Sequence, residues 1–171
     1  MTYSSNYFNI NGRQSGNRVF LTHYVLSPAT NTRLLPSTIK ILDQYIPTIF
    51  DNECFNGQNL PFRVEAANTE IGHLLEHLIL ENLKLLSEEK YGVGDFSGST
   101  SWDWHKDCVG KFNIVIFAQS IERDMFATAF RTSVWILNKI FDCDASIERS
   151  EVNHIPRPIA PSESSQSSLM I

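Results

Sequence analysis

Two histidines and a glutamate near the middle of the chain have the residue types and spacing of a metal-dependent hydrolase. Residues 73–77 read His-Leu-Leu-Glu-His, an H-x-x-E-H sequence. Positions four apart on a helix lie about 40° apart around the axis and about 6 Å apart along it, so His73 and His77 can bind one ion. We therefore predict Zn²⁺ as the cofactor, with Glu76 as the catalytic base that takes a proton from water acidified by the ion.

The third ligand of such a site has several candidates. Catalytic zinc sites typically have three protein ligands and one open position. We rank Glu81 first, because it lies one turn beyond His77 on the same half of the helix, although about 12 Å from His73 along the axis. Glu81 can instead orient His77 through a hydrogen bond while another element supplies the ligand. The candidates in that case come from residues 103–108, and they are Asp103, His105 and Cys108.

The same residues also fit an ordinary solvated helix face. An amphipathic helix needs a polar face, and this one carries His73, Glu76, His77, Glu81, Lys84 and Glu88. Gly72 favours the metal site over that interpretation. Glycine inside a helix costs about 1 kcal/mol relative to alanine and often marks the close approach of another segment or a ligand.

The segment from Trp102 to Asp107, which reads WDWHKD, contains candidates for substrate binding. Trp102 and Trp104, with His105 beside them, can form an exposed aromatic platform, including for cationic groups. The competing interpretation is a hairpin connection in which one indole belongs to the core and the other covers it. We favour the hairpin, because alternate residues of a strand face opposite sides.

The elements that must position these residues alternate between strands and helices. Runs of β-branched and aromatic residues predict strands at residues 18–26, 99–104 and 112–118. The near-continuous apolar character of the last of these predicts a central strand covered on both sides. Helical periodicity predicts three main helices, at residues 37–46, 69–90 and 122–141. The fold class is therefore α+β (mixed α/β), with a small sheet packed against helices, one of which carries the H-x-x-E-H motif.

Length, composition and charge limit the organisation of the chain. Its 171 residues suffice for one domain, which we place at residues 17–150 between a mobile N-terminus at 1–16 and a disordered Pro- and Ser-rich tail at 151–171. The net charge of −5 gives no basic face for nucleic acid or a membrane surface. Three separated cysteines and the lack of a signal peptide or membrane span predict a cytoplasmic location.

The globular part resembles the N-terminal domain of cyanophycin synthetase. The resemblance rests on RVFLTHYVL, on NECFNGQNLPFRVEAANTEIGHLLEHLILENLKLL with its Cys-containing turn, and on YGVGDFSGSTSWDW followed by GKFNIVIFA. In many members that domain carries a metallopeptidase-like site on this helix and trims an Asp-Arg polymer into primers. The resemblance implies that His73 and His77 hold the metal, that Glu76 is the general base, and that Glu81 matches the family's next glutamate.

Departures from that family narrow the expected function. The two ATP-using domains of the synthetase are not in this sequence, so we expect the chain itself not to make the polymer. The family's Gly-rich turn continues into an Arg-bearing stretch, whereas residues 92–100 here contain no Arg. We therefore expect a zinc-dependent hydrolase of another peptide or isopeptide. The alternative is a non-catalytic peptide-binding or scaffold module that partners a separate ATP-dependent amino-acid ligase.

Overall fold

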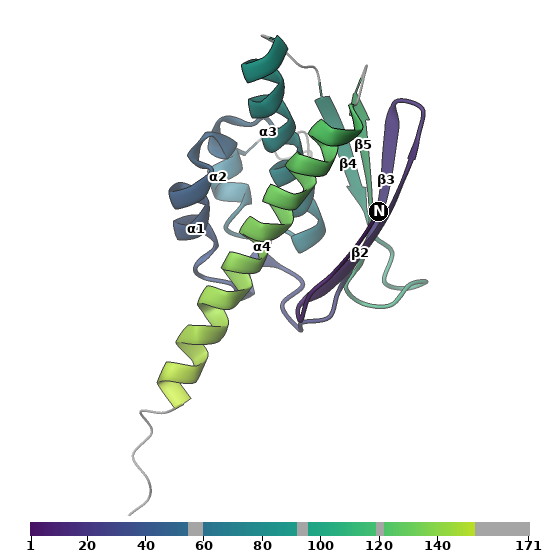
Figure 1. The fold of residues 1–171 in the computed structure, drawn as a ribbon. Coiled ribbons are helices and arrows are strands. Elements are labelled where there is room, and N and C mark those ends of the chain that lie inside the picture. Colours follow the sequence, from purple (N-terminus) through teal and green to yellow (C-terminus); the bar gives the residue numbers. More distant parts are fainter. Residues whose placement is uncertain (55–59, 92–95, 119–121, 153–171) are drawn as a thin grey trace, which may run out of the picture.

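The computed structural model describes residues 1–54, 60–91, 96–118 and 122–152, which form one antiparallel sheet with helices packed against it (Figure 1). The strands are β1 (Thr2–Ser4), β2 (Phe8–Ser15), β3 (Arg18–Val25), β4 (Phe96–Ser101) and β5 (Lys111–Ala118). Their order in the sheet is β1-β2-β3-β5-β4. The main helices are α1 (Thr38–Tyr45), α3 (Ile71–Tyr91) and α4 (Arg123–Val152), with short turns η1 (Thr32–Leu34), η2 (Pro47–Asp51) and α2 (Phe62–Glu65). The predicted α+β class with three main helices is confirmed.

Among the described residues, helices cover one face of the sheet, which corrects the expectation of a strand buried on both sides. In β5, Phe112, Ile114 and Ile116 are buried, while Val115 and Phe117 on the other face are half-buried. The outer face instead receives long side chains: the Arg18 guanidinium lies 5.0 Å from the centre of the Phe117 ring. Apolar residues on both faces therefore reflect partial cover by such side chains rather than a second helix layer.

The N-terminal residues are strands of the sheet, so the prediction of a mobile segment at 1–16 is corrected. β2 pairs with β3 along its whole length, from Phe8 with Val25 to Ser15 with Arg18. Phe8 and Ile10 are fully buried, while polar residues alternate with them. With two buried apolar residues among many polar ones, the alternation in this segment is too weak to predict a strand. The register and the neighbouring strand supply the stability that the local sequence lacks.

Helix α4 extends well past the predicted end at residue 141. The added turns carry polar residues, but one of them is tied to the core: the Asp144 carboxylate accepts hydrogen bonds from the Ser37 backbone N–H at 3.1 Å and from its hydroxyl at 2.6 Å. Ser37 precedes α1, so this contact joins the start of α1 to α4. The predicted tail overlaps α4 at residues 151–152, and the rest of it lies outside the described residues.

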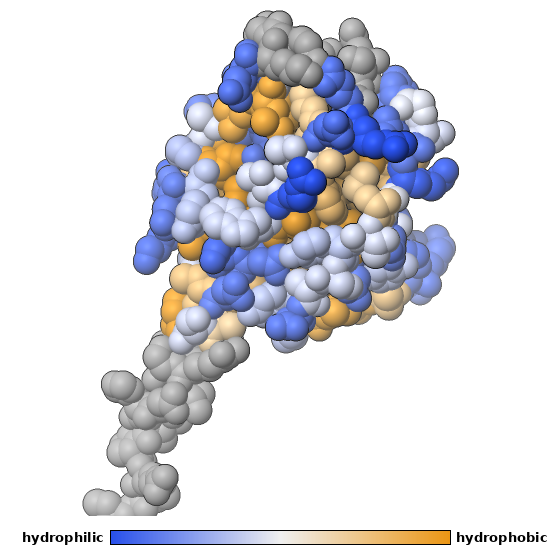
Figure 2. Space-filling model, viewed as in Figure 1, coloured by the Kyte–Doolittle hydropathy of each residue, from blue (hydrophilic) through white to orange (hydrophobic). Residues whose placement is uncertain are grey.

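Hydrophilic and apolar side chains are interspersed on the face where α4 lies in front (Figure 2).

Helix α3 forms where it was predicted and packs closely on the sheet. Leu74, Leu75, Leu78 and Ile79 are fully buried, in a helix that packs on both the sheet and α4. Gly72 marks a close approach, as expected, because a Cβ there would lie 2.4 Å from a ring carbon of Phe112. Glycine thus lets the first turn of α3 reach β5, which also brings the helix alongside β4. None of the described helices is long and apolar enough to cross a membrane.

Candidate metal centre

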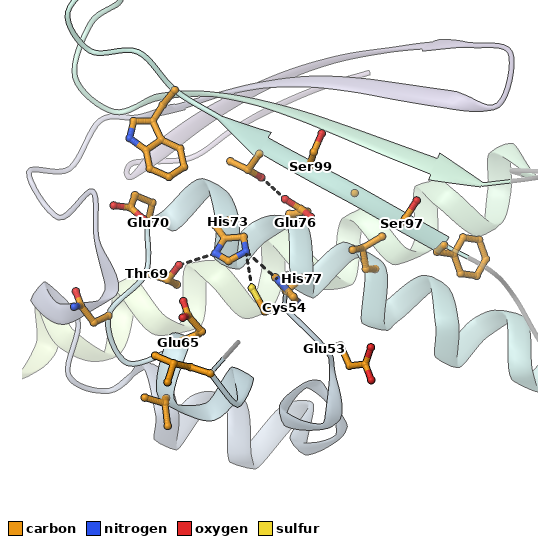
Figure 3. A pocket seen from close by; sticks show the side chains of 18 residues that line it. Glu53, Cys54, Glu65, Thr69, Glu70, His73, Glu76, His77, Ser97 and Ser99 are labelled. Atoms are coloured by element: carbon orange, nitrogen blue, oxygen red, sulfur yellow. Dashed lines mark hydrogen bonds between the residues drawn. The ribbon is translucent and has the colours of Figure 1, made fainter. Parts of the chain in front are cut away.

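A cleft of about 650 Å³ lies between the first turns of α3, the strand β4 and the segment that leads into α2 (Figure 3). The three predicted residues of the H-x-x-E-H motif line it: His73, Glu76 and His77. They come from one helix, whose leucines are held in the core. The cleft therefore opens on the polar side of an otherwise buried helix.

Two imidazoles and one thiol meet in this cleft. The Nε2 atoms of His73 and His77 lie 3.2 Å apart, and Cys54 Sγ lies 3.4 Å from His73 Nε2. All three potential ligand atoms fall within 4.8 Å of one another. Cys54 comes from the segment after η2, so two parts of the chain that are 19 residues apart build the cluster.

Neighbouring residues fix how the two rings point. The Oγ1 atom of Thr69 lies 2.7 Å from His73 Nδ1, which leaves Nε2 directed to the cluster. Phe62 of α2 stacks on His77, with ring centres 4.0 Å apart and an angle of 25° between the planes. A hydrogen bond to the second ring nitrogen is the usual way in which proteins orient a metal-binding histidine.

The donor atoms of the cluster could hold a metal ion, and their spacing can be compared with that of zinc ligands. Zinc bonds of about 2.0–2.1 Å to nitrogen and 2.3 Å to sulfur, at tetrahedral angles, hold ligand atoms roughly 3.3–3.6 Å apart. Two of the three observed separations, 3.2 Å and 3.4 Å, are close to that range, and the third is at most 4.8 Å. Burial and the neighbouring His73 lower the pKa of His77 to about 3, and burial also lowers the pKa of His73. Both imidazoles are therefore neutral at pH 7 and can act as ligands.

Glu76 lies in the same cleft, under strand β4. Its carboxylate accepts a hydrogen bond from Thr100 Oγ1 at 2.5 Å. Gly98 of β4 also lies against Glu76, because a Cβ at this glycine would lie 2.7 Å from Glu76 Oε1. Burial raises the pKa of Glu76 from 4.5 to about 7, against the opposing effect of the Thr100 hydrogen bond. A carboxyl group with that pKa can accept and release a proton near neutral pH.

Glu81, the first-ranked third ligand, does not join the cluster. It is 1% exposed, and neither of its carboxylate oxygens has a hydrogen-bond partner in the described part of the chain. Cys54 lies beside the two histidines in its place. Cys54 and His73 are 19 residues apart, so no helix or strand periodicity predicts that they meet. The Cys-containing turn in the cyanophycin synthetase resemblance was the one available signal.

The segment after β4 contributes one residue to the cleft. Trp102 lines it and is 41% exposed. Trp104 turns inward, where its Nε1 donates to the Lys111 carbonyl at 3.2 Å and its ring lies 5.6 Å from Phe112. Among the residues that the structure describes, the other candidates do not line the cleft: Asp103, Trp104, His105 and Cys108. The hairpin interpretation fits Trp104, and Trp102 keeps a possible contact with substrate.

The charge in the cleft is of one sign. The ionisable side chains at its wall, apart from the metal-ligand cluster, are those of Glu53, Glu65, Glu70 and Glu76. No Lys or Arg belongs to the described lining.

Searches against models of known protein families and against curated proteins find no match to this chain.

Proposed function

We propose that the protein is a zinc-dependent hydrolase of peptide or isopeptide bonds. The observation that carries the proposal is the meeting of Cys54, His73 and His77 beside Glu76 in one open cleft. A purely structural zinc site is closed by four protein ligands, whereas hydrolytic sites have three and leave a position open. Three ligand candidates next to a buried carboxylate match the second kind.

Each residue of the cleft has a distinct part in the proposed reaction. The three ligand candidates would hold the ion, which when bound polarises a carbonyl and acidifies water. Glu76 accepts the proton of the attacking water and gives it to the departing amine. Thr100 keeps the Glu76 carboxylate in place through its hydroxyl. The reaction consumes one water and one amide bond and forms one carboxyl group and one amine, so no further reactant is needed.

The substrate is expected to be neutral or cationic. Glu53, Glu65 and Glu70 at the wall of the cleft, together with Glu76 when it is ionised, repel a polyanion and attract a positive group. This chemistry, together with the resemblance to the N-terminal domain of cyanophycin synthetase, supports an amide substrate with basic residues.

The proposed partner of the protein is a separate ATP-dependent ligase. Cys54 must be reduced to bind zinc, which supports a cytoplasmic location.

Metal content and turnover together test the proposal. Purified protein should hold about one zinc ion, as catalytic sites of this kind do, and His73→Ala should hold almost none. Glu76→Gln should keep the zinc and lose cleavage of a mixed peptide library followed by mass spectrometry. A protein with less than about a tenth of an equivalent of metal, unchanged by His73→Ala, would refute the metal site. Zinc and peptide binding without cleavage would favour the scaffold alternative.

A further inference from the structure

The outer edge of strand β4 lies along the metal centre. We propose that this edge binds the main chain of an extended, positively charged peptide as a sixth strand of the sheet, an inference that rests on the proposed function for the identity of the ligand. β4 is the last strand in the order β1-β2-β3-β5-β4. Six of its residues and near neighbours line the cleft: Phe96, Ser97, Gly98, Ser99, Thr100 and Trp102.

The hydrogen-bond pattern of the sheet shows which backbone groups point to that edge. In an antiparallel pair, alternate residues exchange hydrogen bonds, and the residues between them direct N–H and C=O to the opposite side. The Val25 N–H donates to the Gly110 carbonyl at 2.9 Å, next to the Tyr24–Lys111 pair of the β3–β5 register. Counting by twos along β5, even-numbered residues bond to β3 and odd-numbered residues bond to β4.

The same count identifies the outward-facing residues of β4. Odd-numbered β5 residues are opposite Ser97, Ser99 and Ser101, so these three serines bond to β5. Phe96, Gly98 and Thr100, which lie between them, direct their N–H and C=O away from the sheet. Within the described part of the chain, β4 pairs with β5 alone, and no other backbone hydrogen bond reaches these groups.

The outward groups lie beside the proposed catalytic base. Gly98 packs directly on Glu76, and the Thr100 side chain donates to it. Figure 3 shows the strand crossing above Glu76, with Ser97 and Ser99 turned away from the cluster. A peptide that pairs with Gly98 and Thr100 therefore passes next to Glu76, which is where a scissile bond has to lie.

The edge lacks the features by which proteins prevent strand pairing. Exposed edges are usually protected by charged residues, proline or very short strands. The β4 sequence FSGSTS contains neither charge nor proline, whereas β1 at the other edge has only three residues. Main-chain pairing with such an edge is a common mode of peptide recognition, in which backbone hydrogen bonds supply affinity.

The charges in the cleft indicate what the peptide carries. Glu65 is 8% exposed, its carboxylate has no hydrogen bond or ion pair with any described residue, and it points into the cleft near His73 (Figure 3). Glu70 lines the same wall. Carboxylates that line a cleft without a cationic neighbour attract a positive group, so a cationic side chain of a bound peptide would pair with them. This selects lysine- or arginine-bearing peptides over acidic ones.

Amide hydrogen exchange on metal-free protein tests the docking without requiring catalysis. The probe is the hexapeptide acetyl-Ala-Lys-Ala-Ala-Lys-Ala-amide, with a matched peptide in which glutamate replaces both lysines. Saturating lysine peptide should slow exchange of the Gly98 and Thr100 amides at least about tenfold, because they gain partners. The Ser97 and Ser99 amides, already bonded to β5, should change little. N-methylation of alternate peptide nitrogens should weaken binding at least about threefold, with little effect at the positions between.

Three results would overturn the inference. They are no binding of the lysine peptide up to about 1 mM, no change at Gly98 and Thr100 when it binds, or an effect of N-methylation that does not alternate. Tighter binding of the glutamate peptide would overturn the charge assignment. Because no metal is present, pairing can be observed even when the hydrolase proposal fails. A zinc-loaded enzyme that cleaves peptides without protecting this edge would refute the docking alone.

Discussion

The Nε2 atoms of His73 and His77 lie 3.2 Å apart and point at each other across the cleft. Both rings are neutral because burial lowers their pKa values. Two neutral imidazoles in this arrangement share one proton or share an ion. Thr69 and Phe62 hold the rings in place without help from a metal. The two rings are therefore already positioned without an ion, which supports the metal site that we propose.

Zinc should stabilise the folded protein through Cys54. A ligand at about 100 times its dissociation constant adds about 2.7 kcal/mol to the free energy of unfolding. Thermal unfolding in excess zinc and in chelator should therefore differ by several degrees in the wild type. Cys54→Ala should lose most of that difference, because it removes one of three ligands. Cys143→Ala, at a cysteine outside the cluster, is the matched control. An equal zinc effect in both variants would exclude Cys54 as a ligand.

Glu76 should make the metal-free protein less stable above neutral pH. Its folded pKa, about 7, exceeds its ordinary value of 4.5, so the folded state holds the proton more tightly. The resulting stability is complete below pH 4.5 and is lost as pH rises through 7. Glu76→Gln removes this loss, because its amide is neutral at every pH.

Chemical denaturation at several pH values measures the difference between the two proteins. The free energy of unfolding of Glu76→Gln minus that of the wild type should grow by roughly 3 kcal/mol between pH 4.5 and pH 8. Thr132→Val, at an exposed site on α4, serves as a control for denaturation itself. A difference that does not depend on pH would show that burial does not perturb this carboxyl group.

The sequence was sufficient for the helix of the site but not for its partners. His73, Glu76 and His77 follow from helical spacing, which is a local property. Cys54 and Thr100 reach the site through tertiary packing, and no spacing rule connects them to α3. Thr100 became important because Gly72 and Gly98 let α3 approach the sheet. Such contacts depend on where a helix and a strand pack on each other, and the local patterns of the sequence do not predict that position.

The strands show the same division between local and distant causes. β3 and β5 have strong runs of β-branched and aromatic residues, and both were predicted within a residue or two. β2 relies on Phe8 and Ile10 and on its pairing with β3. The end of α4 depends on the bond from Asp144 to Ser37, a contact between residues 107 positions apart. Segments held by distant partners were therefore the ones that the sequence missed.

His23 should limit stability in acid. It is fully buried in β3 between Phe8 and Phe112, and neither ring nitrogen has a hydrogen-bond partner among the described residues. Burial lowers its pKa from 6.5 to about 3. The unfolded state takes up the proton first as pH falls below 6.5, so stability is lost over that range. His23→Leu should reduce this loss by roughly 2 kcal/mol at pH 5.

Denaturation of His23→Leu at pH 7.5 and pH 5 checks this expectation. The variant should gain stability relative to the wild type on acidification, whatever its difference at pH 7.5. His105→Leu, at an exposed histidine, is the matched control and should follow the wild type at both pH values. If His23→Leu also follows the wild type, the buried ring is not the group that titrates.

Thr100 should set the proton affinity of Glu76 during turnover. Its hydroxyl donates to the carboxylate at 2.5 Å and thereby lowers the pKa of Glu76 against the effect of burial. Thr100→Val keeps the shape of the side chain but removes the donor, so the pKa of Glu76 should rise. The acid limb of the kcat/KM profile, which reports the base in the free enzyme, should then move to higher pH. Thr100→Ser, which keeps the hydroxyl, should restore the wild-type limb, and zinc content should be the same in all three proteins. A uniform drop in kcat/KM at every pH in Thr100→Val would mean that Thr100 only supports the packing of β4 on α3.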